Sequence, residues 1–279
     1  MNSLIKVGIT LAVIAASQAQ EVVVDINSLI EPDIAAKEYA LMQELGFSTS
    51  KWLARSQFGL YAITQGIPVT PSSIEEHFFA HLHAADRTPC ETPVPFQQIK
   101  LLPPLMCRWL VSRESSSVIH SFNEHLDQQP LSEEQKKFYR AVALIAFNAQ
   151  KYAQTSTINT SVYNFITRCR SADHPVYLIG NTNGECFDAL QKRFSAELAL
   201  FDKSHRYLSC QDGLLKPARA FYKAFEEHCA VSPDRSIVCL EGEATQAHMP
   251  ASASYLGSCI CVATQPEDLQ SYLEQPHSR

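Results

Sequence analysis

The sequence predicts an α/β fold, in which a Rossmann-like parallel sheet is covered by helices and interrupted by an inserted all-helical segment. Beyond about residue 160, short apolar runs alternate with segments of helical periodicity, which is typical of parallel sheets buried on both faces. A similar apolar run, EVVVD, occupies residues 21–25. Between the two lie about 130 residues that read as helices almost throughout, so the first strand is expected to join the later ones in one sheet.

The predicted core elements follow one another in a regular order. The expected strands are EVVVD (21–25), VYLIG (176–180), RYLSC (206–210), SIVCL (236–240) and SCICVA (258–263). The expected helices lie at 185–198, at 216–230 and near 244–256, the last closed by Gly257. Pro217 stands in the first turn of the second helix, where its missing N–H costs nothing.

The inserted segment carries signals for helix ends. Its first helix is expected to stop at Gly46, because glycine readily adopts the backbone conformation that follows a helix C-terminus. Two further helices are expected to begin with capping boxes, formed by Ser73 with Glu76 and by Ser132 with Gln135.

Proline and aromatic residues shape the rest of this segment. The Pro-rich stretch 88–104 is expected to cross the domain in an extended conformation. Trp52, Trp109 and the many Phe and Tyr residues nearby are most simply core residues.

The composition is that of an ordinary globular protein. The chain has 279 residues, of which 46% are hydrophobic and 19% are charged, which suits one large domain or two small ones. Its net charge is −6, and positive charges are not clustered, so a nucleic-acid surface is excluded. Beyond the N-terminal segment, no stretch is long and apolar enough to predict a membrane span.

The N-terminal segment, residues 1–19, has the features of a signal peptide. Lys6 gives a short basic start, and Val7 to Ala16 form an apolar run too short to cross a bilayer. Small residues at Ser17 and Ala19 predict cleavage after Ala19. The expected location is therefore periplasmic or secreted; if this segment is instead an ordinary helix, the chain is cytoplasmic.

The nine cysteines do not form a recognisable disulfide or zinc pattern. An odd number leaves at least one unpaired, and no CxxC is present. Cys210, Cys239, Cys259 and Cys261 lie in apolar, strand-like runs, where cysteine behaves as a small hydrophobe. They are expected to pack in the core.

Polar residues follow the apolar runs at the places where a parallel sheet binds its ligands. They are Asp25 and Asn27, Asn181 and Thr182, Lys216, and Glu241 and Glu243. Ligands of open parallel sheets bind outside the carboxyl ends of the strands, where these side chains are expected to gather. The residues provide carboxylates, amides and one ammonium group.

This order of residues resembles the haloacid dehalogenase (HAD) superfamily, in the branch that has a helical cap after the first motif. The four corresponding stretches are VVVDINSLI, VYLIGNTN, DGLLKPARAFYKAF and SIVCLEGEATQAHMPASASYLGSCICV. The resemblance covers about half of the chain. It implies a HAD-like core formed by residues 20–32 and 160–279, and a helical cap formed by residues 33–159.

The resemblance also implies roles for individual residues. Asp25 occupies the position of the nucleophile that forms a covalent aspartyl intermediate, and Lys216 that of the lysine that orients it. Asn27 stands where the family has a general acid and base, and an amide cannot take that role. The loss of a general acid typically costs about 10²–10⁴-fold in rate, unless the leaving group needs no proton, as with halide or an acyl phosphate.

The resemblance further implies magnesium, with Asp25, the Asn27 backbone carbonyl and Glu241 or Glu243 as candidate ligands. Substrate binding falls to Gly180, Asn181 and Thr182. Gly180 replaces the hydroxyl residue that binds the phosphoryl oxygen, and Thr182 is two residues out of register.

Two classes of function follow. The first is a HAD-type hydrolase, acting on a small phosphorylated molecule with Mg²⁺, or a dehalogenase-like enzyme that attacks carbon without a metal. The second is a catalytically inactive fold, exported and used to bind a protein partner. A separate alternative is a Zn²⁺ or Cu²⁺ site on the helix that carries His77, His81 and His83, although a polar helix face explains these residues more simply.

Overall fold

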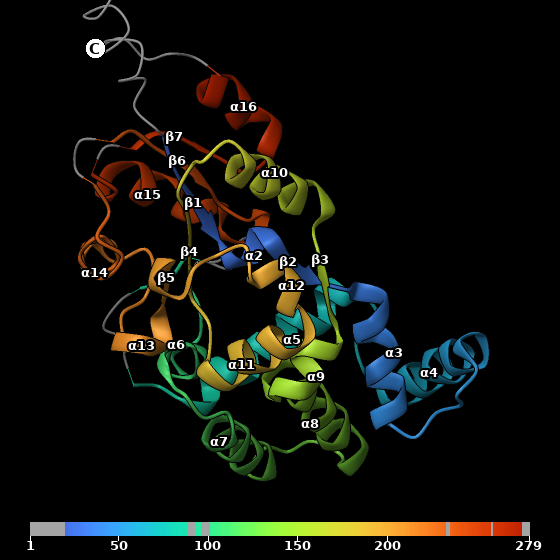
Figure 1. Cartoon of the computed structure of the whole chain (residues 1–279). Helices are drawn as coiled ribbons and strands as arrows, with labels where there is room; N and C mark the ends of the chain where they lie inside the picture. The colour runs from blue at the N-terminus through green and yellow to red at the C-terminus, as the bar shows by residue number, and fades with distance from the viewer. Residues whose placement is uncertain (1–19, 89–92, 96–100, 233–234, 258, 275–279) are drawn as a thin grey trace, which may run out of the picture.

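The computed structural model describes residues 20–88, 93–95, 101–232, 235–257 and 259–274 (Figure 1). The predicted signal peptide, residues 1–19, lies outside the described residues, as do Cys90 and parts of the predicted extended stretch 88–104.

The core of the fold is a five-stranded parallel sheet. Its strands are β1 (Glu21–Asp25), β4 (Val176–Gly180), β5 (Arg206–Leu208), β6 (Ile237–Leu240) and β7 (Cys259–Ala263), in the order β5-β4-β1-β6-β7. All four neighbouring pairs are parallel. The central strand is therefore the first in sequence, and the predicted α/β parallel-sheet fold is confirmed.

Helices cover both faces of this sheet, which explains why its strands read as continuous apolar runs. Alternate residues of β1 serve the two faces. Val22 and Val24 pack with α10 (Thr160–Ser171), α11 (Gly184–Arg193) and α16 (Pro266–Glu274), whereas Val23 packs with α14 (Arg219–His228). The remaining short core elements are α2 (Ile26–Leu29), α12 (Ser195–Leu198), η1 (Lys203–His205), α13 (Ser209–Asp212), η2 (Glu243–His248) and α15 (Met249–Tyr255).

Two boundaries of the core differ from the prediction. The third strand ends at Leu208, because Ser209 to Asp212 turn into the short helix α13, so Cys210 is not in a strand. Helix α14 begins at Arg219, and Pro217 lies in a turn before it rather than in its first turn. The other predicted core cysteines lie in strands: Cys239 is buried in β6, and Cys259 and Cys261 are half-buried in β7.

Between β1 and β4 the chain forms a helical insertion, defined here as α3 to α9. Its helices are α3 (Ile34–Glu44), α4 (Lys51–Gln65), α5 (Pro71–Ala85), α6 (Pro104–Val111), α7 (Ser116–Asp127), α8 (Glu133–Phe147) and α9 (Ala149–Gln154). The chain enters and leaves the insertion through two paired antiparallel strands, β2 (Ile30–Pro32) and β3 (Ser156–Ile158). Figure 1 shows the insertion on one side of the sheet, with α4 at its outer edge.

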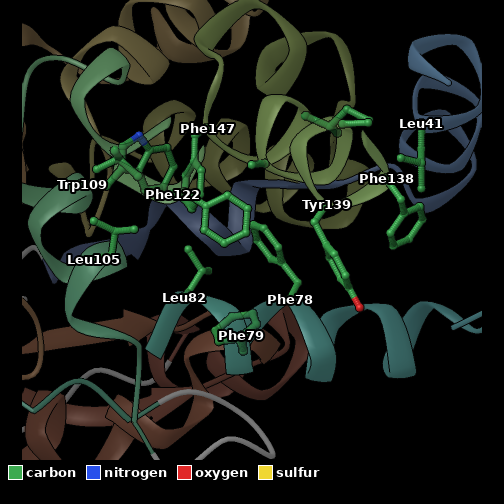
Figure 2. Close-up of a cluster of buried hydrophobic side chains, with 14 of the residues drawn as sticks. Leu41, Phe78, Phe79, Leu82, Leu105, Trp109, Phe122, Phe138, Tyr139 and Phe147 are labelled. Carbon is green, nitrogen blue, oxygen red and sulfur yellow. The ribbon is translucent and has the colours of Figure 1, made fainter. Parts of the chain in front are cut away.

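Aromatic side chains form the core of the insertion (Figure 2). Phe147 contacts Phe78 and Trp109, with ring centroids 5.9 and 5.1 Å apart, and Phe78 also contacts Phe122 at 5.2 Å. Trp109 is thus a core residue as predicted. Trp52 is not: it is 77% exposed, because α4 packs through the stripe that contains Phe58 and turns Trp52 outward.

The helix-end predictions for the insertion hold in part. Gly46 follows α3 with a φ of 85°, and Ser132 with Gln135 forms the capping box of α8. The capping box of α5 lies three residues earlier than predicted, because Thr70 accepts a hydrogen bond from the N–H of Ser73 and Pro71 starts the helix. No helix in the described part of the chain has the length and apolar character needed to cross a membrane.

Candidate active site

Asp25 lies at the carboxyl end of the central strand and also starts the next helix. Its backbone is extended, and its Oδ1 accepts a hydrogen bond of 2.7 Å from the N–H of Asn27, as expected for an aspartate at a helix N-terminus. The hydroxyl of Ser28 donates to the Asp25 carbonyl at 2.6 Å. Strand and helix therefore fix this carboxylate from both sides, and it is fully buried.

Lys216 joins Asp25 to Glu241 in a buried ion cluster, called the triad below. The Lys216 ammonium lies 2.6 Å from Asp25 Oδ2 and 2.7 Å from both carboxylate oxygens of Glu241. The exposed fraction of all three side chains is 0%. Burial alone would lower the pKa of Lys216, but the charges of Asp25 and Glu241 outweigh burial and raise that pKa well above its ordinary value.

Glu241 is held by neighbours on the next helix as well as by the lysine. The Ser252 hydroxyl donates to Glu241 Oε1, and the hydroxyls of Tyr222 and Ser252 lie 2.9 Å apart. Burial raises the pKa of the Glu241 carboxyl, and the Lys216 charge opposes that shift. The chain of hydroxyls gives Glu241 one fixed orientation, which faces Lys216.

Asn181 and Thr182 have structural partners in this arrangement. The Asn181 side chain holds the backbone of Lys216 on both sides: its Oδ1 accepts from the lysine N–H at 2.8 Å and its Nδ2 donates to the lysine carbonyl at 3.0 Å. The N–H of Thr182 donates to Ser209 Oγ at 2.9 Å. Of the predicted substrate-binding pair, Asn181 therefore positions Lys216, and Thr182 connects the segment after β4 to Ser209 at the start of α13.

Two glycines allow close packing where the resemblance implies polar contacts. A Cβ added to Gly180, whose φ is 153°, would lie 2.5 Å from Cγ2 of Ile26. Ile26 thus fills the space that a hydroxyl side chain at position 180 would occupy. A Cβ on Gly242 would lie 2.8 Å from the carbonyl oxygen of Asn27, so Gly242 packs directly against the predicted backbone metal ligand.

A loop of the helical insertion closes over this edge of the sheet. Asn183 is fully buried, and its Nδ2 lies 3.0 Å from the carbonyl of Trp109 and 2.9 Å from that of Ser112. The N–H of Gly184 donates to the same Ser112 carbonyl at 3.0 Å, and the Glu185 carboxylate accepts from the N–H of Ser115 at 3.0 Å.

We call these contacts between residues 183–185 and the α6–α7 loop (residues 112–115) the latch. A Cβ on Gly184 would lie 3.1 Å from Cα of Arg113, so the close approach suits glycine. The sequence pattern gave no reason to single out Asn183. Its only signal was an asparagine directly before a helix start, which is the usual N-terminal capping residue.

His248 is a second residue that the sequence pattern missed. It ends η2, which packs against α2, and only 2% of its surface is exposed. Its Nε2 lies 3.1 Å from the carbonyl of Pro95. Burial lowers the pKa of His248 to about 4, with a further lowering by the charge of Lys216 and a partial compensation by Asp25. His248 is thus coupled electrostatically to the triad.

The predicted magnesium ligands do not fit a divalent ion in this arrangement. The Lys216 ammonium already lies between the carboxylates of Asp25 and Glu241, and Gly242 covers the Asn27 carbonyl. The side chain of Glu243 lies outside the described part of the structure. Among the side chains that are described, no group of three His, Cys, Asp or Glu is placed to hold a metal ion.

The histidines on α5 have other neighbours. The ring centroid of His81 lies 4.5 Å from the ring centroid of Tyr139 and 6.0 Å from that of His125 on α7. Burial lowers the pKa of both histidines. His77 and His83 share this helix, but within the described residues the structure gives the predicted Zn²⁺ or Cu²⁺ alternative no third ligand.

Comparisons with known proteins identify the fold. No protein-family model and no curated protein matches this sequence. A HAD family enzyme from Bacteroides thetaiotaomicron is 13% identical, with a TM-score of 0.52 over 92% of this chain and 100% of that chain. An aspartate-to-alanine variant of that enzyme, in complex with magnesium and inorganic phosphate, is 14% identical, with a TM-score of 0.51 over 92% and 99%.

A HAD phosphatase from Thermococcus onnurineus is 11% identical, with a TM-score of 0.48 over 91% of this chain and 98% of that chain. At such identities, the two matches with TM-scores above 0.5 establish the fold alone. The chain therefore has the HAD-like fold that its four motifs predicted.

Proposed function

We propose that this chain is a HAD-type hydrolase in which Asp25 displaces a leaving group that departs as a stable anion. One observation carries the proposal. Asp25 keeps a lysine partner at 2.6 Å, while the position of the general acid, Asn27, offers only a backbone N–H at 2.7 Å. The nucleophile is thus held beside a cation, but no side chain of this pair can protonate a leaving group.

The surroundings of Asp25 favour attack on carbon over attack on phosphorus. A phosphoryl group carries negative charge that must be balanced as the bonds change, and the triad already has two carboxylates for one lysine. The described side chains around Asp25 do not fit a divalent ion, so they offer no second cation to balance a phosphoryl group. A 2-haloacid needs neither a metal nor a proton donor for the displacement.

The proposed reaction has two steps. A carboxylate oxygen of Asp25 forms a bond to the carbon of the substrate, and the carbon–halogen bond breaks as halide leaves with the bonding electrons. Water then attacks the Asp25 carbonyl carbon of the ester, which releases a 2-hydroxyacid and one proton and restores the carboxylate. Lys216 remains paired with Glu241 while Asp25 is esterified, so the ammonium is never left without a counter-ion.

The test is an assay of the full chain on 2-haloacids, acyl phosphates and phosphate monoesters, with and without Mg²⁺. We expect halide release from 2-haloacids that does not depend on Mg²⁺ and is lost in Asp25→Asn. Asp33→Asn is the matched control, because Asp33 also starts a helix and accepts a hydrogen bond from Ala36 at 2.9 Å. Halide release by Asp25→Asn would refute the nucleophile, and Mg²⁺-dependent release of phosphate would replace the proposed reaction by the phosphatase one.

A second candidate is a protein that binds a partner and has no catalytic activity. Two observations favour it: the triad is fully buried, and α4 exposes Trp52, Leu60 and Ile63 at 77%, 67% and 76%. Exposed apolar groups of this size are typical of interaction surfaces. No turnover on any substrate class, together with no covalent adduct on Asp25 by intact-mass spectrometry, would favour this candidate over the hydrolase.

We also propose that the chain is exported after cleavage of residues 1–19. Cleavage after Ala19 would leave Gln20 directly before the central strand β1, so the processed chain would keep the whole sheet. Fractionation of cells that produce the full chain, beside a version that lacks residues 1–19, tests it. Recovery of both forms from the cytoplasm would contradict export.

A further inference from the structure

His248 has a free basic nitrogen beside the triad. The Nε2 atom lies 3.1 Å from the Pro95 carbonyl, which can only accept a hydrogen bond, so Nε2 carries the ring proton. The other nitrogen, Nδ1, then has a free lone pair. It is buried and finds no hydrogen-bond partner within the described part of the chain. A buried polar atom without a partner is rare in folded proteins and calls for a reason.

The position of His248 suits the hydrolysis of the Asp25 ester, a step for which the motif residues provide no general base. η2, which His248 ends, packs against α2, which begins directly after Asp25 and contains Asn27. The charges of Lys216 and Asp25 both act on the ring. The ring is neutral at physiological pH, because burial opposes its protonation, so it can accept a proton but does not bring one.

We propose that His248 is the general base of the second half-reaction, in which its Nδ1 takes a proton from the water that hydrolyses the Asp25 ester. This inference rests on the proposed function. It supplies the base that Asn27 cannot provide, and it leaves the first step, which needs no proton, to Asp25 alone.

The step balances in atoms and charge. The oxygen of water forms a bond to the carbonyl carbon of the Asp25 ester, and one of its protons moves to Nδ1 of His248. The bond between that carbon and the substrate oxygen then breaks, and the proton passes from His248 to the departing alkoxide. The second proton of the water remains on the new Asp25 carboxyl group and is released to solvent, so the products are the Asp25 carboxylate, one proton, a neutral His248 and a 2-hydroxyacid.

The test separates the two half-reactions in the full chain, with 2-chloropropionate as the probe. His248→Gln places an amide nitrogen where it can still donate to the Pro95 carbonyl, but it has no basic nitrogen. We expect turnover to fall by about 10²–10⁴-fold, the usual contribution of a general base, and an Asp25 ester to accumulate in the intact-mass spectrum. His120→Gln is the control, because His120 is 73% exposed on α7 and pairs with Glu124 at 3.2 Å; it should behave as the wild type.

The outcomes distinguish this inference from the proposed function. Turnover by the wild type, with an unchanged rate and no adduct in His248→Gln, would refute the role of His248 and leave the hydrolase standing. No turnover by the wild type and no adduct in any variant would remove both. If His248→Gln does not reach the native circular dichroism spectrum, His248→Asn serves as the second variant, with the same ester expected to accumulate.

Discussion

The triad makes a quantitative prediction about stability, tested by replacing Lys216 with methionine. Methionine has a similar volume and no charge, so Lys216→Met keeps the packing and removes the cation. The variant leaves the carboxylates of Asp25 and Glu241 buried without their shared partner. Of the hydrogen bonds to the two carboxylates, those from the Asn27 N–H, from Ser252 and from the Cys239 thiol remain.

The magnitude follows from the burial and contacts of the triad. Removing one partner of a fully buried ion pair costs about 3–5 kcal/mol, because the remaining charge is left uncompensated. Here one lysine serves two carboxylates, at 2.6 Å and 2.7 Å, so the upper half of that range is expected. Protonation limits the cost: neutralising a glutamate of ordinary pKa about 4.3 at pH 7 takes about 4 kcal/mol, at 1.36 kcal/mol per pH unit.

The same reasoning fixes the pH dependence. Burial already raises the folded-state pKa of Glu241, and loss of the lysine removes the charge that opposes this shift. A carboxyl with a raised folded-state pKa destabilises the protein above its unfolded-state pKa, and the penalty disappears as pH falls toward that value. The cost of Lys216→Met is therefore expected to shrink from about 4 kcal/mol at pH 7 to about 1 kcal/mol at pH 5.

Urea unfolding of the wild type and Lys216→Met at pH 7 and pH 5 measures both quantities. Lys223→Met is the matched control, since Lys223 forms an exposed pair with Glu227 at 3.6 Å, and such pairs contribute about 0.5 kcal/mol or less. A loss below 1 kcal/mol at pH 7, or a loss that grows at pH 5, would refute the buried ion cluster as the source of the effect.

Three further predictions concern the latch, the central glycine and the insertion. Asn183→Ala removes hydrogen bonds to the α6–α7 loop, so stability should fall by about 2–4 kcal/mol and amide exchange in that loop should accelerate, as read by hydrogen–deuterium exchange. Gly180→Ala should cost about 1–3 kcal/mol through overpacking against Ile26, and the losses from Gly180→Ala and Ile26→Ala should be less than additive when both are combined in thermal unfolding. The pKa of His81 and of His125 is lowered by burial, so stability should fall as pH drops below about 6.5; a chain with both changed to Gln should show a smaller slope, and the part that remains comes from His248.

The fold was predictable because the signals that specify it are local. Parallel strands buried on both faces must be apolar throughout, and helix starts need capping side chains, so both leave marks over five to fifteen residues. The strand-end rule then indicated which polar residues meet. The structure brings together Asp25, Lys216 and Glu241, which come from three separate segments of the sequence.

The rest depends on contacts that the local sequence does not record. Asn183 carries only the local signal of a helix cap in the sequence, whereas its contacts with the α6–α7 loop join residues about 70 positions apart. Trp52 looked like a core residue because large aromatic side chains usually are, but the orientation of α4 decided otherwise. His248 gave no motif, since its role follows from the packing of η2 against α2.

The departures from the family motifs are linked to one another in space. Ile26 fills the space beside Gly180, and Gly242 packs on the carbonyl of Asn27. Each of the two glycines thus lacks the polar side chain of the motif and packs too closely against its neighbour for a substrate or ion to enter between them. The latch joins the α6–α7 loop to residues 183–185, which follow β4 at the same edge of the sheet as Asp25, and we infer that a substrate reaches Asp25 past this loop. On this inference the loop opens during turnover, and a variant with a weakened latch, Asn183→Ala, should have a lower KM because entry is easier. If the site is a structural ion cluster, the same variant should lose stability and gain no turnover.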